Sequence, residues 1–259
     1  MGKYNILLDK LFDYWSKESE LHPINNDRCF VKDGLMLKNL DLNIDIEESW
    51  DKIQKKVMFI AKDQNQSDNP TERYDQDSRT WLKDRKDVQE LQGKNIKFWV
   101  NIAILLWGLC KTDPQNPWWY DEVIQHFEEV KHFFNTYPFA FIESKKQPGG
   151  PELKSNVLKK YLDRDRDLLF KEIDILKPNM IVCFHHHIYG TVISKFPQDE
   201  LIEIGEDHPI RYHPKTDTFI FCSYHPSYLN ETPENIYQGV MHHYRVFLES
   251  EEYRMCKNK

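Results

Sequence analysis

The segment that decides the fold is VMFIAKDQN, residues 57–65. Its first five residues are apolar, and a short apolar run of this length is typical of a strand buried on both faces of a sheet. The run ends at Asp63, Gln64 and Asn65, which are too polar for the core. Similar apolar runs follow at residues 139–142, 180–184 and 219–222.

Helical spacing of apolar residues surrounds and separates these runs. Thr232, Pro233 and Glu234 form the expected start of the last helix, as N-cap, first position and first turn. Apolar strands that alternate with helices imply an α/β protein whose parallel sheet is covered on both faces. We expect a single domain over residues 1–259, with residues 1–50 as a helical N-terminal extension packed on it. The predicted helices cover residues 4–18, 47–56, 95–110, 118–134, 154–176 and 233–249.

Composition excludes several classes of protein. Lys and Arg total 35 against 42 Asp and Glu, a net charge of −7, which argues against a histone-like binder but permits a local basic groove. None of the nine glycines forms a dinucleotide-binding or P-loop motif. The five cysteines are scattered and lack CxxC pairs, so a zinc ribbon, an iron–sulfur cluster and a disulfide framework are disfavoured. We expect no metal and no cofactor.

The sequence also lacks membrane signals. The longest apolar run, residues 102–110, is shorter than the ~20 residues that a transmembrane helix needs. Lys3, Asp9 and Lys10 stand near the start without a small-residue cleavage site, so we expect no signal peptide. We therefore expect a soluble, cytoplasmic, monomeric protein.

Chemically capable side chains follow all four predicted strands. Ligands bind outside the carboxyl ends of the strands in a parallel sheet, so these groups should converge on one edge. Together they resemble a general acid/base site with phosphate-binding capacity. Each also has a structural explanation: a lone Asp often caps a turn, and three adjacent histidines cannot all face one metal ion. The groups are Asp63; Glu143 with Lys145 and Lys146; His185–His187; and His225.

Two of these strand ends resemble motifs of the uracil-DNA glycosylase superfamily. AKDQN, residues 61–65, is similar to the water-activating motif, commonly Gly-Gln-Asp-Pro-Tyr, with Asp63 in register. HPSYL, residues 225–229, matches the family's His-Pro-Ser-Pro-Leu at four of five positions. Residues 139–150 resemble the strand whose terminal Asn reads uracil, followed by a basic loop with Pro and Gly. Helix and strand order agree from about residue 50 to about residue 250.

The resemblance implies a three-layer α/β/α fold with a central four-stranded parallel sheet. It implies a DNA glycosylase that hydrolyses the N-glycosidic bond of a flipped-out pyrimidine and leaves an abasic site. Asp63 would orient water and stabilise the oxocarbenium-like sugar, and His225 would stabilise charge at O2 of the leaving base. Gln64, Asn65 and Glu143 would bind the base. The DNA would contact Lys145, Lys146, Ser227, Tyr228 and Leu229, with Leu229 filling the gap left by the flipped base.

Two departures from the family pattern bear on the substrate. Asn65 replaces the Tyr that blocks the space beside pyrimidine C5, so a C5 substituent could fit. Glu143 replaces the uracil-reading Asn; when protonated, it can donate to N3 of cytosine and accept from the N4 amine. Burial would raise its pKa in the required direction. We expect a modified cytosine as the substrate, and the family's members that remove such bases from phage DNA suggest host defence.

Other interpretations stay open at this point. The protein could be an ordinary uracil-DNA glycosylase of base excision repair, with Ser144 or another neighbour as the reader. It could be a catalytically silent module that binds DNA or a nucleotide, or a hydrolase of free nucleosides, which an acidic surface would not hinder. Glu143 could be only a salt-bridge partner of Lys145 or Lys146, and that lysine pair could be a solvated surface feature.

Overall fold

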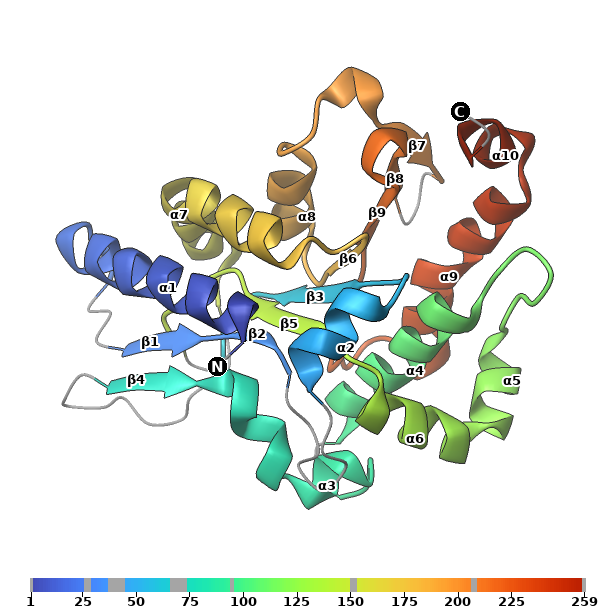
Figure 1. Cartoon of the computed structure of the whole chain (residues 1–259), viewed down its shortest axis with the longest axis horizontal. Helices are drawn as coiled ribbons and strands as arrows, with labels where there is room; N and C mark the ends of the chain where they lie inside the picture. Colours follow the sequence, from blue (N-terminus) through green and yellow to red (C-terminus); the bar gives the residue numbers. More distant parts are fainter. Residues whose placement is uncertain are drawn as a thin grey trace.

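The computed structural model describes residues 2–25, 29–36, 45–65, 74–93, 96–149, 153–205 and 209–257. Figure 1 shows helices on both sides of a central sheet. The helices are α1 Lys3–Leu21, α2 Ile46–Lys52, α3 Lys86–Gln89, α4 Lys97–Lys111, α5 Tyr120–Gln125, α6 Phe127–Thr136, α7 Ser155–Leu176, α8 His186–Ile193, α9 Pro233–Glu249 and α10 Glu251–Lys257. The strands are β1 Cys29–Lys32, β2 Gly34–Leu35, β3 Val57–Ala61, β4 Tyr74–Asp77, β5 Ala140–Glu143, β6 Met180–Cys183, β7 Ile202–Ile204, β8 Ile210–His213 and β9 Thr218–Cys222.

The central sheet is mixed, with a parallel middle. Among the described residues its order is β2-β5-β3-β6-β9-β8-β7. The four neighbours β5, β3, β6 and β9 run parallel to one another, whereas β2, β8 and β7 are antiparallel to the strands beside them. The α/β class is therefore confirmed. The parallel part of the sheet thus comprises four strands, and the whole sheet has seven in the part of the chain that the structure describes.

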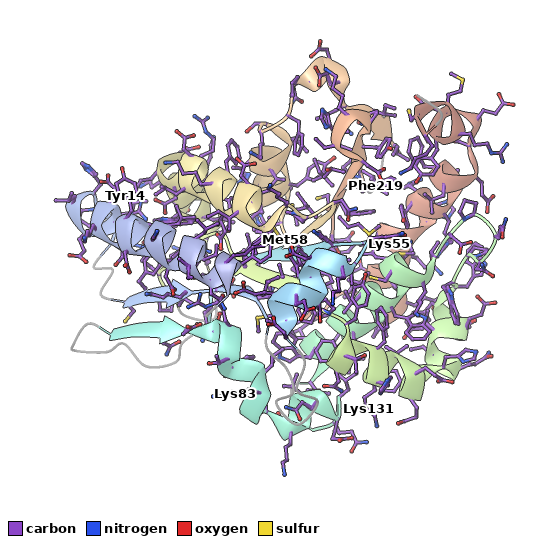
Figure 2. The ribbon with its side chains drawn as sticks, in the orientation of Figure 1. Tyr14, Lys55, Met58, Lys83, Lys131 and Phe219 are labelled. Atoms are coloured by element: carbon purple, nitrogen blue, oxygen red, sulfur yellow. The ribbon has the colours of Figure 1, made fainter. Side chains whose placement is uncertain are left out.

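Successive side chains of β3 point to opposite faces of the sheet, and helices cover both faces. Val57 and Phe59 pack with α4, α6 and α9 on one face, whereas Met58 and Ile60 pack with α1, α7 and α8 on the other. All four side chains are fully buried. Figure 2 shows Met58 between the layers and Tyr14 on the outer side of α1. Burial on both faces produces the continuous apolar run, because neither set of alternating side chains meets water.

The strands that sequence reasoning missed lack such runs. β8 alternates Ile210 and Tyr212, which are buried, with Arg211, which is partly exposed. β2 and β7 have two and three residues, and β4 is the polar YDQD, which pairs with β1. Residues 74–77 therefore form a strand although none of the four is aliphatic. Edge and antiparallel strands need only one apolar face, so their sequences carry a weaker signal.

The helices agree more closely with expectation. Thr232 Oγ1 accepts a hydrogen bond from Asn235 N at 3.1 Å, which confirms the predicted start of α9. The helix expected over residues 118–134 is two helices, because His126 leaves helical geometry between α5 and α6. The N-terminal extension is not purely helical, since β1 and β2 follow α1 and β2 joins the central sheet.

Candidate functional site

The chain segments that follow β3 and β5 run side by side beyond the sheet. Lys145 N donates to Lys62 O at 2.9 Å, and Gly149 N donates to Gln64 O at the same distance. This pairing continues the parallel register of the two strands past their carboxyl ends. It brings the loop after Glu143 against Asp63, as the sequence predicted. Gly150, the last residue of that predicted loop, lies outside the described residues.

Asp63 is buried against a lysine. Its side chain is 7% exposed, and its Oδ2 lies 3.0 Å from Lys145 Nζ. Gly149 packs so closely on this carboxylate that a Cβ there would overlap Oδ2, which explains the glycine. Burial raises the pKa of Asp63, while Lys145 and Lys62 oppose that shift. The carboxylate is thus held in a desolvated place with one cation in direct contact.

Lys145 is positioned by three groups and is itself buried, with its side chain 4% exposed. Besides Asp63, its ammonium donates to the Gln147 carbonyl and lies 5.0 Å from the centre of the Tyr161 ring. The expectation that Lys145 belongs to an exposed basic pair is therefore wrong. The side chain turns inward to the catalytic candidate Asp63 instead of outward to a phosphate path.

Lys146 is also misassigned as a DNA contact. Its side chain is fully buried, and its Nζ lies 2.6 Å from Asp33 Oδ1 and 2.8 Å from Glu172 Oε2. Burial opposes its charge, but the two carboxyls outweigh this effect and raise the pKa of Lys146. Burial and Asp33 raise the pKa of Glu172 well above its ordinary value. An ammonium enclosed in this way cannot reach a phosphate, so its role is to neutralise Asp33 beneath the site.

Glu143 is the second carboxyl at this edge of the sheet. It is 8% exposed, and its backbone N donates to Asp33 Oδ2 at 2.7 Å. Its Oε2 is buried and has no hydrogen-bond partner among the described residues. Burial, with repulsion from Asp33 and Asp63, raises the pKa of Glu143 to about 8. The side chain is therefore mostly neutral at pH 7, and within the described part of the chain no basic residue forms an ion pair with it.

His225 stands in the loop after β9. Its Nδ1 accepts a hydrogen bond from Ser227 N at 3.2 Å, so in the neutral ring the hydrogen is on Nε2. Burial and the charge of Lys62 lower the pKa of His225 to about 4. Its ring centre lies 5.5 Å from that of Phe98 and 6.4 Å from that of Phe184. His225 is thus a neutral Nε2–H donor beside an aromatic wall at neutral pH.

Helix α4 fixes the loop that carries His225. Asn101 of α4 is fully buried, and its Nδ2 donates to Pro226 O at 2.7 Å. Lys97, at the start of α4, donates to the carbonyls of Tyr228 at 2.9 Å and Glu231 at 3.0 Å. Sequence reasoning missed both anchors, although an Asn within the apolar stretch of α4 was a visible signal. A buried polar side chain in such a stretch needs a partner, and here the partner is the loop.

The end of the loop is exposed and apolar. Leu229 is 88% exposed, and Tyr228 stacks on Tyr224 with ring centres 5.6 Å apart. Ser227 is half-buried between this tip and His225. Large apolar side chains at an exposed tip are typical of contact with another molecule.

The remaining predicted base contacts follow Asp63. Gln64 is half-buried, and its Oε1 is buried without a hydrogen-bond partner among the described residues. Asn65 is exposed and pairs with Gly149 through the backbone. The two side chains therefore border the site at different depths.

Asp33, Glu172 and Tyr161 reach the site from elements that the sequence did not connect with it. Asp33 stands between β1 and β2, and Glu172 and Tyr161 lie on α7. The glycine that follows Asp33 is the one sequence signal for the position of Asp33. Gly34 has a φ of 138°, which favours glycine there.

The histidine run after β6 has a structural role. His185 caps α8, its Nδ1 accepting from His187 N at 3.1 Å, and its Nε2 lies 3.4 Å from Ser155 Oγ. Burial lowers the pKa of His185 to about 4. No cluster of three or more His, Cys, Asp or Glu suited to a metal ion occurs within the residues that the structure describes.

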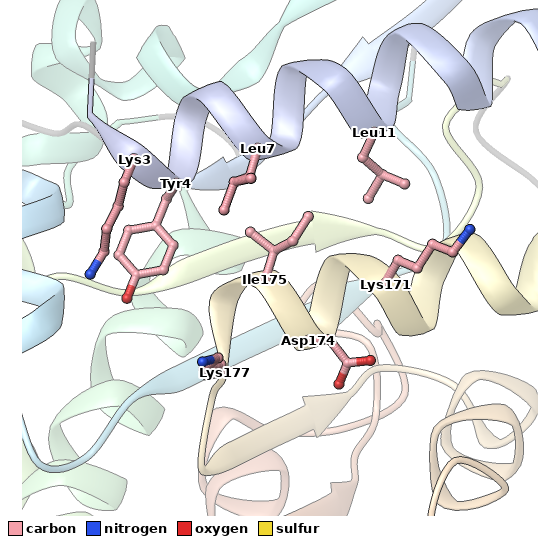
Figure 3. Close-up of a pocket in the computed structure, with 8 residues that line it drawn as sticks. All are labelled: Lys3, Tyr4, Leu7, Leu11, Lys171, Asp174, Ile175 and Lys177. Carbon is pink, nitrogen blue, oxygen red and sulfur yellow. The ribbon is translucent and has the colours of Figure 1, made fainter.

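A separate hollow of about 550 Å³ lies between α1 and α7. Figure 3 shows Leu7, Leu11 and Ile175 pointing into it, with lysines at its margins. Lys177 borders it three residues before β6, so the hollow lies toward the amino ends of the parallel strands. It shares no residue with the group around Asp63.

Comparison with known families found no family model that matches this chain. No curated protein matches it either. In the described ranges, no helix combines the length and apolarity needed to cross a membrane.

Proposed function

We propose that this protein is a DNA glycosylase that removes a modified cytosine from a flipped-out nucleotide. The observation that carries the proposal is Glu143, a buried carboxyl with a pKa of about 8 and an unpartnered Oε2 at the same sheet edge as Asp63. A neutral carboxyl has one donor and one acceptor, the pair that N3 and the N4 amine of cytosine require. Uracil presents N3–H and O4, which a neutral carboxyl pairs with the positions of donor and acceptor exchanged, so the base panel below has to distinguish the two bases.

Ser144 does not compete for the role of reader. It is fully buried, and its hydroxyl donates to Lys62 O at 3.1 Å, a commitment to the loop itself. This argues against ordinary uracil excision with Ser144 in place of the family's Asn. Asn65 is exposed beside the site and smaller than a tyrosine, which supports room for a substituent at C5.

Asp63 and His225 would stabilise the two charges that develop as the glycosidic bond breaks. Loss of the base leaves positive charge on the sugar and negative charge on the pyrimidine O2. The Asp63 carboxylate, in contact with Lys145 Nζ at 3.0 Å, would orient the attacking water and stabilise the sugar. The Nε2–H of neutral His225 would donate a hydrogen bond to O2. Loss of this donor would slow base release by ~10²–10³-fold.

The loop tip would hold the DNA open. Leu229 would enter the space left by the flipped base, and Ser227 would contact a flanking phosphate. Lys154, exposed at the start of α7, would supply a cation to the DNA path in place of Lys145 and Lys146.

A base panel tests the proposal. Duplex DNA, single-stranded DNA and free nucleosides carrying uracil, thymine or C5-modified cytosines are incubated with the protein, and released bases are identified by mass spectrometry. We expect release of a modified cytosine from DNA. The Glu143→Ala variant should lose this preference, and Asn65→Tyr should reject bulky C5 groups. Release only from free nucleosides, or the same ranking of bases in all three proteins, would refute the proposal.

A further inference from the structure

Activation of water by Asp63 does not explain why Lys145 is held directly against its carboxylate. A cation 3.0 Å from Asp63 cancels part of the negative charge that would stabilise the sugar. Lys145 is also an expensive way to provide charge, because its side chain is only 4% exposed and its ammonium is almost out of water. An amine next to a carboxylate base within hydrogen-bond reach is, however, the arrangement of a nucleophile and the group that deprotonates it.

We propose that Lys145 is a nucleophile that forms a Schiff base with C1′ of an abasic deoxyribose, which makes the protein a lyase as well as a glycosylase. The inference rests on the proposed function for its substrate, because an abasic site is what base removal leaves. The Gln147 carbonyl and the Tyr161 ring hold the ammonium of Lys145 against Asp63, the carboxylate that the proposed function assigns to the sugar. Lys145 would then be a catalytic residue in its own right.

The reaction balances with groups that are present. Asp63 takes a proton from the Lys145 ammonium, and the free amine adds to the C1′ aldehyde of the ring-opened abasic sugar. Asp63 returns the proton to the hydroxyl of the adduct, which leaves as water, and a protonated imine remains. Asp63 next removes a proton from C2′, the C3′–O bond breaks, and the 3′ phosphate departs with its strand. Water then hydrolyses the imine and releases Lys145 and an unsaturated aldehyde.

Neighbouring lysines meet these requirements less well. Lys146 is enclosed by Asp33 and Glu172 and has no route to a substrate. Lys62 is half-buried at the same edge, but within the described residues no carboxylate forms an ion pair with it. Lys62 is therefore the alternative nucleophile against which Lys145 has to be tested.

Borohydride trapping tests the inference without requiring base removal. A duplex with one abasic site, made beforehand by another enzyme, is incubated with the protein and sodium borohydride, which reduces an imine to a stable secondary amine. We expect a covalent protein–DNA species whose tryptic peptide carries the adduct on Lys145. The variant Lys145→Arg, which keeps the positive charge beside Asp63, should lose the species, whereas Lys171→Arg on the exposed face of α7 should keep it.

The outcomes separate the two proposals. Peptide mapping of the wild-type adduct decides the inference even if Lys145→Arg folds poorly, which its urea unfolding midpoint would reveal. An adduct on Lys62, an adduct spread over surface lysines, or no adduct would overturn the role of Lys145. If the wild-type protein creates alkali-labile sites in modified-cytosine DNA but traps nothing, the glycosylase stands and the lyase fails. If Lys145 is trapped but no base is ever released, the lyase stands and the glycosylase fails.

Discussion

Replacement of Glu143 by Gln should change how the stability of the protein depends on pH. The amide keeps the shape of the carboxyl but does not titrate. In the folded protein the pKa of Glu143 is about 8, compared with an ordinary value of 4.5. Between these values the folded state keeps a proton that the unfolded state releases, so stability falls as pH rises. The loss is complete once pH exceeds the folded pKa.

The magnitude follows from this window. Each pH unit within it costs the wild-type protein about 1.4 kcal/mol, so raising the pH from about 5.5 to about 7.5 costs about 2.7 kcal/mol through this group alone. The Gln variant does not bear this cost. The difference in unfolding free energy, variant minus wild type, should therefore increase by about 2.7 kcal/mol over that interval.

Urea denaturation of both proteins across this pH series measures the difference. The other titrating groups, Asp63 and Glu172 among them, are common to both proteins, and their contributions are largely removed by subtraction. A difference in unfolding free energy that is the same at every pH would reflect only how well the amide fits the site, and it does not bear on the pKa of Glu143. If the difference does not change with pH, Glu143 is ionised in the folded protein, and the basis for cytosine recognition is refuted.

Four further predictions concern residues around the same site. Asp63→Asn should slow base release by roughly 10²-fold or more and leave DNA affinity nearly intact in a filter-binding assay; unchanged turnover would remove Asp63 from catalysis. His225→Ala should lose ~10²–10³-fold, and since the pKa of His225 is about 4, the wild-type profile should contain no histidine step near pH 6.5. Lys146→Met should lower the unfolding free energy by about 3–5 kcal/mol because it strands Asp33 without its cation; a loss below about 1 kcal/mol would contradict a buried ion pair. Leu229→Ala should change stability by less than about 0.5 kcal/mol, because the side chain is 88% exposed, but slow excision from duplex more than from single-stranded DNA; equal effects on both would exclude a wedge.

Local pattern was enough for the parallel core. The runs around Val57, Ala140, Met180 and Phe219 lie within or beside the four parallel strands because burial on both faces demands unbroken apolar residues. The same reasoning placed Asp63 and the loop after Glu143 at one edge, and the backbone bonds between the two segments bear this out. The peripheral strands were missed because one exposed face leaves little apolar signal.

The lysine pair shows where pattern reasoning fails. Lys145 and Lys146 are adjacent and charged, which in most sequences means exposure. Their burial depends on partners that are far away in the chain: Asp63 for Lys145, and Asp33 and Glu172 for Lys146. A local window contains none of these carboxylates, so it cannot show that the charges are compensated.

The sequence by itself determined the α/β class, the strands of the parallel core and the identity of the polar groups at their ends, because each of these depends on neighbours in the chain. Only the tertiary structure decided what state those groups are in. At pH 7 Glu143 is mostly neutral, His225 is a neutral donor and Lys145 is bound to Asp63. Each state is set by burial and by charges brought together from distant segments. The physical reason is that desolvation and Coulomb interactions depend on distance in space, which residue spacing along the chain does not specify.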